Sequence, residues 1–356
     1  MKSKVYFIDF TTSFSYTIFD KLKCIAERSH LTDIFAVKDN VAVKLHFGEY
    51  GNFGNVNARY VRFFIDLIKS SGARPFLTDT NTLYTGERSN SVDHLNNAVR
   101  NGYDYSVVNA PIIIADGLYG MSEIELESNS SFTEFAYIAS DIYYADAMLV
   151  ISHTTGHEVT GYGGALKNVG MGCASRKGKM DMHSTSAPIV KEKKCTGCAK
   201  CVKWCPVNAI QIINKKAKIN KDLCIGCSEC ISVCPFKAIG IEWNQASDII
   251  NAKIVDYAYA CLKNKQNKVF YVNFLNNITN LCDCTPIHGI KEIPDIGILF
   301  SSDIVSIDKA SLDLINESAG YNLFQKLHPK ANVEKQLIYA EKLGLGCIEY
   351  EIIKVN

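Results

Sequence analysis

Long apolar runs and a secretion signal are both missing from this sequence of 356 residues. No uninterrupted apolar stretch reaches the roughly 18 residues that a membrane-spanning helix needs, so we expect no membrane span. The apolar run in the first segment, MKSKVYFIDFTTS, is interrupted by Asp9 and is too short for the core of a signal peptide. These absences predict a cytoplasmic protein.

An excess of either charge is also missing. The 38 lysines and arginines nearly balance the 37 aspartates and glutamates, which gives a formal net charge of +1. Nucleic acids and anionic membranes attract proteins through an extended positive field, and this chain has none. We therefore expect no nucleic-acid partner, and a lysine or arginine can matter only through its individual position.

Several cofactor motifs are absent as well. No G-x-G-x-x-G follows the strand-like segments Val5–Phe10 and Ala147–Thr154, so neither a nicotinamide nor a dinucleotide flavin is indicated. The Walker A pattern G-x4-G-K-S/T is missing, and so is the C-x3-C-x2-C pattern of radical SAM enzymes.

Cysteine, in contrast, is abundant, with 14 residues. Without a secretion route these residues are expected to stay reduced, and most of them to bind metal. Eight lie in one internal repeat, in which Lys193–Ile212 and Lys221–Ile241 share the pattern C-x-G-C-x-x-C-x-x-x-C-P-x-x-A-I-x-I. C-x2-C-x2-C-x3-C-P is the spacing that holds a 4Fe-4S cluster, with the fourth cysteine directed to the other cluster.

The repeat therefore predicts two 4Fe-4S clusters whose ligands cross over between its copies. The expected ligands are Cys195, Cys198, Cys201 and Cys234 for the first cluster, and Cys224, Cys227, Cys230 and Cys205 for the second. A pair of four-cysteine zinc sites is the alternative, but zinc requires neither the third cysteine nor the proline. The segment resembles bacterial-type two-cluster ferredoxins, and this resemblance implies one-electron transfer at low potential.

Outside the repeat, short apolar runs alternate with amphipathic stretches. The expected strands are Val5–Phe10, Val41–Phe47, Pro75–Thr80, Ile112–Asp116, Ala147–Thr154, Val269–Leu275, Ile296–Ser302 and Cys347–Ile353. The expected helices are Tyr16–Glu27, Val56–Ser71, Ser91–Asn101, Phe135–Ala145, Ser306–Asn316 and Val333–Leu343. This alternation predicts an α/β fold, with a parallel or mixed sheet covered by helices.

The position of the repeat suggests how the domains are organised. We expect residues 1–187 and 244–356 to form one α/β domain, whose second part returns to the sheet of the first. A small ferredoxin-type α+β domain at 188–243 would interrupt it. The alternative is that residues 244–356 form a separate small domain.

A glycine-rich stretch, Ile151–His183, directly follows one expected strand. Ligands of parallel sheets bind beyond the carboxyl ends of the strands, so this stretch is where chemistry is expected. Its backbone N–H groups at Gly161, Gly163 and Gly164 could converge on an anion, beside the positive charge of Lys167. The alternative interpretation is a set of structural turns.

Other polar residues follow neighbouring strands. His46 ends the strand Val41–Phe47, and Asp79 to Tyr84 follow the next strand. We expect His46, His153, His157 and Lys167 to form a catalytic site for a small anionic substrate, with a histidine as general acid. Lys44 and Arg88 could add positive charge there.

The segment LCDCTPIHG places Cys282 and Cys284 on either side of Asp283. Two thiols at this spacing could chelate an additional metal as a third centre, or could act as a redox pair. Two sulfurs do not complete a metal site, and the candidates for completing it are Cys173, His183 and His288. The alternative is two small buried apolar residues. Apolar patterns surround the remaining cysteines, which we expect to be inert core residues: Cys24, Cys261 and Cys347.

Together these motifs are similar to a known family. S-H-x-x-G-H-x-x-x-G-Y-G-G-A-L-K-N-x-G-M-G-C, G-K-M-x-M-H, the two-cluster segment and C-D-C resemble the iron-sulfur proteins containing domain of unknown function 362. The resemblance implies a ferredoxin module inserted into a larger domain, and it implies no particular reaction.

The sequence thus predicts an iron-sulfur oxidoreductase. Electrons from a redox protein such as a ferredoxin would pass through the two clusters to the anionic-substrate or metal site. The alternatives are a non-enzymatic electron carrier and a metallocentre-assembly or redox-sensing protein.

Overall fold

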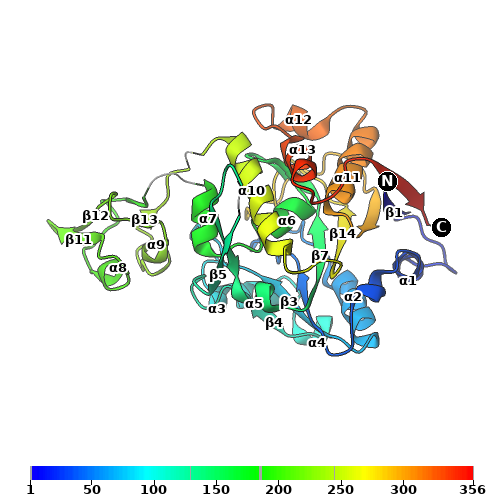
Figure 1. Ribbon diagram of the computed structural model, residues 1–356, viewed down its shortest axis with the longest axis horizontal. Helices are drawn as coiled ribbons and strands as arrows, with labels where there is room; N and C mark the ends of the chain where they lie inside the picture. Colours follow the sequence, from blue (N-terminus) through cyan, green and yellow to red (C-terminus); the bar gives the residue numbers. More distant parts are fainter. Residues whose placement is uncertain (1, 129, 184–186, 244, 356) are drawn as a thin grey trace.

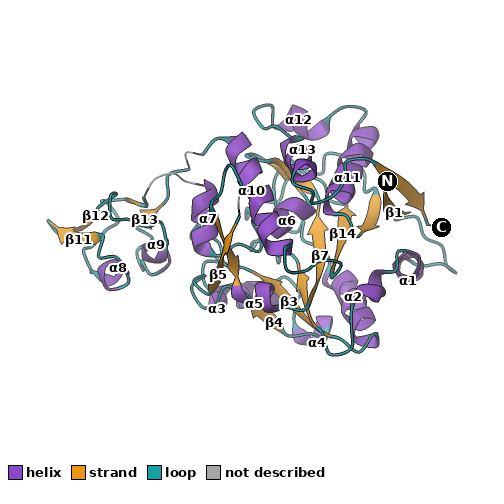
Figure 2. Cartoon of the chain, in the orientation of Figure 1, coloured by secondary structure: helices purple, strands orange, loops and turns teal. Residues whose placement is uncertain are grey.

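An eight-stranded sheet covered by helices organises the computed structural model, which describes residues 2–128, 130–183, 187–243 and 245–355 (Figures 1 and 2). From edge to edge its strands are β16 (Tyr350–Lys354), β1 (Ser3–Asp9), β15 (Gly297–Ser301), β14 (Val269–Leu275), β7 (Ala147–His153), β2 (Asn40–Lys44), β3 (Arg74–Asp79) and β4 (Ile112–Ile114). Only β15 pairs antiparallel with its neighbours, and the other pairs are parallel. The predicted α/β fold with a mixed sheet is confirmed.

The central strands are buried on both faces. Every residue of β14 is buried, and so is every residue of β7 except His153. Along β7, Met148 and Val150 pack into one apolar cluster, whereas Leu149 and Ile151 pack into the other. Strands in this position carry continuous apolar runs, which is why the sequence pattern located them well.

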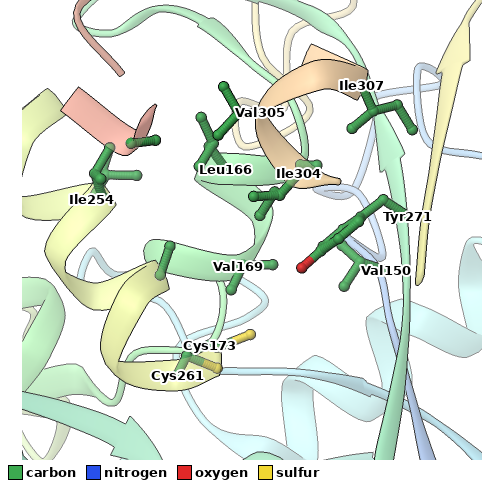
Figure 3. Packing of buried hydrophobic residues seen from close by; sticks show 14 of the residues in the cluster. Val150, Leu166, Val169, Cys173, Ile254, Cys261, Tyr271, Ile304, Val305 and Ile307 are labelled. Atoms are coloured by element: carbon green, nitrogen blue, oxygen red, sulfur yellow. The ribbon is translucent and has the colours of Figure 1, made fainter. Parts of the chain in front are cut away.

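Helices from different parts of the chain cover the two faces. One face packs against α1 (Ile18–Arg28), α2 (Ala58–Ser70) and α4 (Tyr105–Val108). The other packs against α6 (Ala165–Gly170), α10 (Ser247–Leu262), α11 (Ile304–Ala319) and α13 (Lys335–Lys342). Figure 3 shows side chains of α6, α10 and α11 meeting above β7 and β14, with Cys173 and Cys261 side by side in the same cluster.

The structure differs from the helix predictions in two places. The helix expected at Phe135–Ala145 is wrong, because Phe135–Ala139 forms strand β6, which pairs with β5 (Glu123–Glu127), and only α5 (Ser140–Tyr144) is helical. The sequence analysis missed α10, which is buried around most of its circumference and so lacks a polar face. A helix of this kind has no amphipathic period to detect.

The remaining helices lie around the sheet. They are α3 (Ser91–Arg100), α7 (Arg176–His183) and α12 (Leu323–Leu327), with one 3₁₀ turn, η1, at Leu31–Ile34. In the described part of the chain, no helix combines the length and the apolar character needed to cross a membrane.

The cysteine-rich segment forms a small body beside the sheet domain (Figure 1). It contains the hairpin of β11 (Ile210–Ile213) and β12 (Lys216–Ile219), the pair of β10 (Ile189–Val190) and β13 (Ile239–Gly240), and the short helices α8 (Lys200–Lys203) and α9 (Glu229–Ser232). Strands that precede this body in the chain and strands that follow it lie in the same eight-stranded sheet.

Gly170 lies where α6 contacts α10 most closely. A Cβ atom at this residue would overlap the carbonyl oxygen of Ile254, which belongs to backbone and cannot rotate away. We expect Gly170→Ala to lower the free energy of unfolding by about 2–3 kcal/mol, because the clash outweighs the better helix propensity of alanine. Chemical denaturation measures this change. Gly240→Ala is the control, because a Cβ there meets nothing within 4 Å, and an equal loss in both variants would contradict the prediction.

Candidate functional site at the carboxyl edge of the sheet

The parallel strands β14, β7, β2 and β3 end at the same edge of the sheet. His46 follows β2, and Asp79 ends β3. His153 ends β7, and His157 ends the short strand β8 (Thr155–His157), which pairs with β9 (Gly161–Gly163). The segment after β14 carries Cys282 and Cys284. The fold therefore brings these sequence-selected residues to one edge, where α/β proteins bind ligands.

The C-D-C turn, defined here as Cys282–Cys284, is held by loops that follow β2, β3 and β7. Asn52 donates from Nδ2 to the carbonyl oxygens of Cys282 (3.4 Å), Thr285 (3.0 Å) and Ile287 (3.2 Å). The Tyr84 hydroxyl donates to the carbonyl oxygen of Cys284 at 2.8 Å. These bonds fix the backbone of the turn and leave both thiols available for other contacts.

Glycines allow the loops to come this close. A Cβ at Gly156 would lie 2.7 Å from the carbonyl oxygen of Thr279, and one at Gly54 would overlap the Asp283 carboxylate. The glycines of the two loops thus serve close packing against the segment that carries the thiols.

The two thiols face a histidine and a lysine. The Sγ atoms of Cys282 and Cys284 and one ring nitrogen of His157 all lie within 4.8 Å of one another, close enough to hold a metal ion. The Lys167 ammonium lies 3.5 Å from Cys282 Sγ, and the backbone N–H of Cys284 donates to the same sulfur at 3.3 Å. All four side chains are half-buried.

His157 completes this group, and the three residues proposed to complete it lie elsewhere in the described structure. Cys173 is fully buried in the core next to Cys261. His183 is buried against the Trp243 ring, with 4.7 Å between ring centroids. His288 is exposed beside Phe53. The sequence analysis selected His157 as a catalytic residue but did not group it with the two cysteines, because the contact depends on the approach of the segment after β14 to the β8–β9 hairpin.

The two thiols differ in acidity. A hydrogen bond from the Cys284 thiol and the nearby Lys167 charge outweigh burial and lower the pKa of Cys282 to about 6. The same bond, together with burial, raises the pKa of Cys284 well above its usual range. Burial alone would lower the pKa of Lys167, but the two neighbouring sulfurs raise it. At neutral pH the site therefore holds a thiolate, a thiol and an ammonium.

His153 has no free nitrogen. Its Nδ1 is 2.8 Å from Asp283 Oδ2, and its Nε2 is 2.6 Å from the carbonyl oxygen of Asn276. Burial favours the neutral ring, but Asp283 and this carbonyl outweigh it and raise the pKa of His153. This expected catalytic residue therefore anchors the C-D-C turn through Asp283.

His46 and His157 both accept backbone hydrogen bonds at Nδ1. The N–H of Gly48 donates to His46 at 3.0 Å, and those of Val159 and Thr160 donate to His157 at 3.2 and 3.1 Å. Burial lowers the pKa of both histidines well below the usual range, with Arg88 adding to the effect at His46 and Lys167 at His157. Both rings are therefore neutral, with the proton on Nε2.

Two cations expected to bind an anionic substrate are already paired. Lys44 lies 3.1 Å from Asp79, and Arg88 lies 3.0 Å from Glu49 and 3.5 Å from Asp79. Lys44 and Arg88 are 1% and 2% exposed, so no ligand reaches them from solvent. Lys167, in contrast, has no carboxylate within 4.0 Å among the described residues.

The glycine-rich loop also binds an anion of the protein itself. The N–H groups of Ala165 and Leu166, at the start of α6, donate to the Asp308 carboxylate at 2.7 and 2.9 Å. A Cβ at Gly164 would lie 2.5 Å from that carboxylate, so the glycine makes room for it. Burial raises the pKa of Asp308 to about 6 despite these donors. The predicted external anion is therefore replaced at this position by Asp308.

The eight repeat cysteines line two hollows in the small body. One hollow is bordered by Cys195, Cys198, Cys201 and Cys234, and the other by Cys205, Cys224, Cys227 and Cys230. Each hollow thus combines three cysteines of one repeat with the fourth of the other. Of the three cysteines expected in the core, Cys261 is buried, whereas Cys24 and Cys347 are half-buried.

A family model described as Domain of unknown function (DUF362) matches residues 41–313. The chain belongs to the DUF362 family. In this DUF362 protein the match begins at β2 and ends in α11, so it includes both the carboxyl edge of the sheet and the cysteine-rich body. A search of curated proteins finds no match.

Two solved structures resemble this DUF362 protein. The lactate racemase apoprotein from Thermoanaerobacterium thermosaccharolyticum is 15% identical with a TM-score of 0.35, over 68% of this chain and 44% of that one. A structural-genomics protein from Thermotoga maritima is 13% identical with a TM-score of 0.37, over 74% of this chain and 52% of that one. The chain thus spans about half the length of each.

The acidity of Cys282 can be measured by alkylation. Iodoacetamide reacts with the thiolate, so the rate at Cys282 should rise between pH 5 and 7 and level off above the pKa of about 6. Lys167→Gln should move the midpoint to higher pH, because it removes the ammonium beside the sulfur. Mass spectrometry of the modified peptides measures the extent of alkylation at Cys282 and at Cys284. A midpoint near the ordinary thiol value of about 8.5 would contradict the assignment.

Proposed function

We propose that this protein is an iron-sulfur oxidoreductase that relays electrons from a redox protein such as a ferredoxin, through two 4Fe-4S clusters, to the site beside Lys167. The observation that supports this most is the arrangement of the eight cysteines in two hollows, with crossed sets of four. This is the ligand pattern of two-cluster ferredoxins. When bound, such clusters supply one-electron transfer.

The surroundings of the thiols fit clusters. Backbone N–H groups of Ala217, Ala209 and Ala238 donate to the sulfurs of Cys195, Cys205 and Cys234 at 3.2 to 3.3 Å. Hydrogen bonds of this kind stabilise the charge on cluster sulfur and tune its potential. Gly197 and Gly226, in the cysteine loops, have φ values of +72° and +70°, which a side chain would strain.

The proposed route of the electrons to the site passes through the contact between the small body and the sheet domain. Met180 of α7 and Leu83 belong to an apolar cluster that contains Cys201 of the first ligand set and Cys230 of the second. A Cβ at Gly226, between Cys224 and Cys227 of the second set, would meet Met180 Cγ at 4.0 Å. Leu83 is followed by Tyr84, whose hydroxyl binds the carbonyl oxygen of Cys284. We therefore propose that the second cluster is the one nearer to the carboxyl edge, and that the first receives electrons from the partner.

Lys167 is the reason that the proposal includes a small anionic substrate. Lys167 has no carboxylate partner among the described residues, unlike Lys44 and Arg88, so we propose that an anionic substrate binds beside Lys167 and Cys282. The neutral ring of His157 carries a proton on Nε2 and could donate a hydrogen bond to a bound anion, but it is not charged and so does not serve as the expected general acid. A non-enzymatic electron carrier would need neither group.

Pairs of substitutions test the crossed ligand sets. Cys198→Ala with Cys234→Ala removes two ligands of one cluster, so about four irons per chain should remain of the roughly eight in the wild type. Cys198→Ala with Cys205→Ala removes a ligand from each cluster, so both should be impaired. Iron and sulfide analysis and EPR after anaerobic purification measure this. Uncrossed sets would give the reverse pattern, and zinc without sulfide would rule out the clusters.

The variant Lys167→Ala tests the alternative that the protein is a non-enzymatic electron carrier. This variant should keep the cluster EPR spectra of the wild type, because Lys167 contacts the C-D-C turn and none of the eight proposed ligands. It should lose most binding of small carboxylate or phosphate compounds in a calorimetric screen. If the wild type binds no such anion either, the anionic-substrate part of the proposal is wrong.

A further inference from the structure

We propose that Cys282 and Cys284 form a dithiol–disulfide centre, a two-electron acceptor for the electrons that the clusters deliver one at a time. The inference rests on the proposed function for the source of the electrons, and on the geometry of the C-D-C turn for the acceptor. The two sulfurs lie within 4.8 Å of each other, on residues separated only by Asp283, and both are half-buried. A rotation of the side chains would bring them to bonding distance.

The contacts of Cys282 are those of a reactive thiolate. Its sulfur is approached by the Lys167 ammonium at 3.5 Å and by the N–H of Cys284 at 3.3 Å. A positive charge and a backbone donor stabilise the thiolate. A second thiol beside it can form a disulfide with an oxidised Cys282, or donate a hydrogen bond to the thiolate. The backbone of the turn is fixed by Asn52 and Tyr84, so the two sulfurs stay close in either state.

The same contacts favour a dithiol over a metal ion. A divalent metal between His157, Cys282 and Cys284 would lie close to the Lys167 ammonium, and like charges at this separation repel. Metal-binding histidines usually donate their second ring N–H to a carbonyl or carboxylate. His157 instead accepts from Val159 and Thr160 at Nδ1. Its remaining ring nitrogen therefore carries a proton, which could donate a hydrogen bond to a thiolate.

The electron count is balanced. Breaking the S–S bond between Cys282 and Cys284 needs two electrons, one for each sulfur, and the two proposed clusters, when bound and reduced, would supply one electron each. Cys284 takes up one proton from solvent, and Cys282 remains the thiolate beside Lys167. The reverse reaction returns two electrons and one proton to an oxidised substrate, such as a disulfide compound.

The test uses the anaerobically purified holoprotein in two steps. Diamide, a thiol oxidant, is added first, and the free thiols are alkylated under denaturing conditions and mapped by mass spectrometry. The peptide that contains Cys282 and Cys284 should lose two alkylation sites. A second portion of the oxidised holoprotein receives reduced ferredoxin before it is alkylated, and both sites should return. In Cys227→Ala, which removes a ligand of the second cluster, the disulfide should form equally but return at least about tenfold more slowly.

Two controls separate this pair from other thiols. Cys173 and Cys261 form the matched pair, because they are also neighbours but lie fully buried in the core, and they should stay reduced. Lys167→Gln should slow oxidation of Cys282 about tenfold at neutral pH, whereas Lys167→Arg keeps the charge and should slow it less.

The outcomes distinguish the inference from the proposed function. If diamide forms no disulfide at Cys282 and Cys284, or if the wild type contains a stoichiometric metal that the variant Cys282→Ser loses, the dithiol centre is wrong. If the disulfide forms but returns at the same rate in Cys227→Ala, the centre stands and the electron relay through the second cluster is wrong.

Discussion

The parallel pairing of β14, β7, β2 and β3 is the constraint on which the candidate site depends. Parallel strands send all their carboxyl ends to one edge, and each strand here continues into a loop that carries polar side chains. In the sequence β14 follows the cysteine-rich body and β7 precedes it, yet β14 pairs with β7 from Val269 to Phe274. This pairing carries the C-D-C turn to the histidine and lysine of the glycine-rich stretch. A shift of one residue in that register would turn every side chain of the strand to the opposite face of the sheet.

Most charged groups at this edge neutralise one another, which explains how the fold tolerates them. Asp79 lies between Lys44 and Arg88, and Asp283 lies against His153. Buried charges without such partners would cost several kcal/mol each. Lys167, in contrast, has no carboxylate within 4.0 Å among the described residues, and the charged groups beside it are the two sulfurs. Because the other charged groups are paired with one another, the side chains left to bind or react with a ligand at this site are those of Lys167, His157, Cys282 and Cys284.

The sequence was informative where a residue's neighbours in the chain are also its neighbours in space. Apolar runs located all eight strands of the main sheet, and the spacing of the repeat led to the same two sets of four cysteines that line the hollows. It failed where distant segments meet. The partner of the α6 N–H groups is Asp308, which lies on α11, and nothing near the glycine-rich loop in the sequence indicates it. Likewise, His157 joins Cys282 and Cys284 only because the segment after β14 folds over the β8–β9 hairpin.

The arrangement of the two bodies bears on the kind of chemistry that fits the site. Two apolar side chains, Met180 and Leu83, belong to one cluster with Cys201 and Cys230 of the small body. The proposed electron route passes through this cluster, whereas a substrate must arrive from the solvent side. Lys167 and the two thiols are half-buried, so they can meet both the delivered electrons and a substrate from solvent. In the proposed function, two clusters would supply single electrons, and the two thiols would collect a pair of electrons for the chemistry of one bond. The charge formed on the sulfurs needs a fixed counter-ion, and Lys167 lies beside Cys282 to provide it.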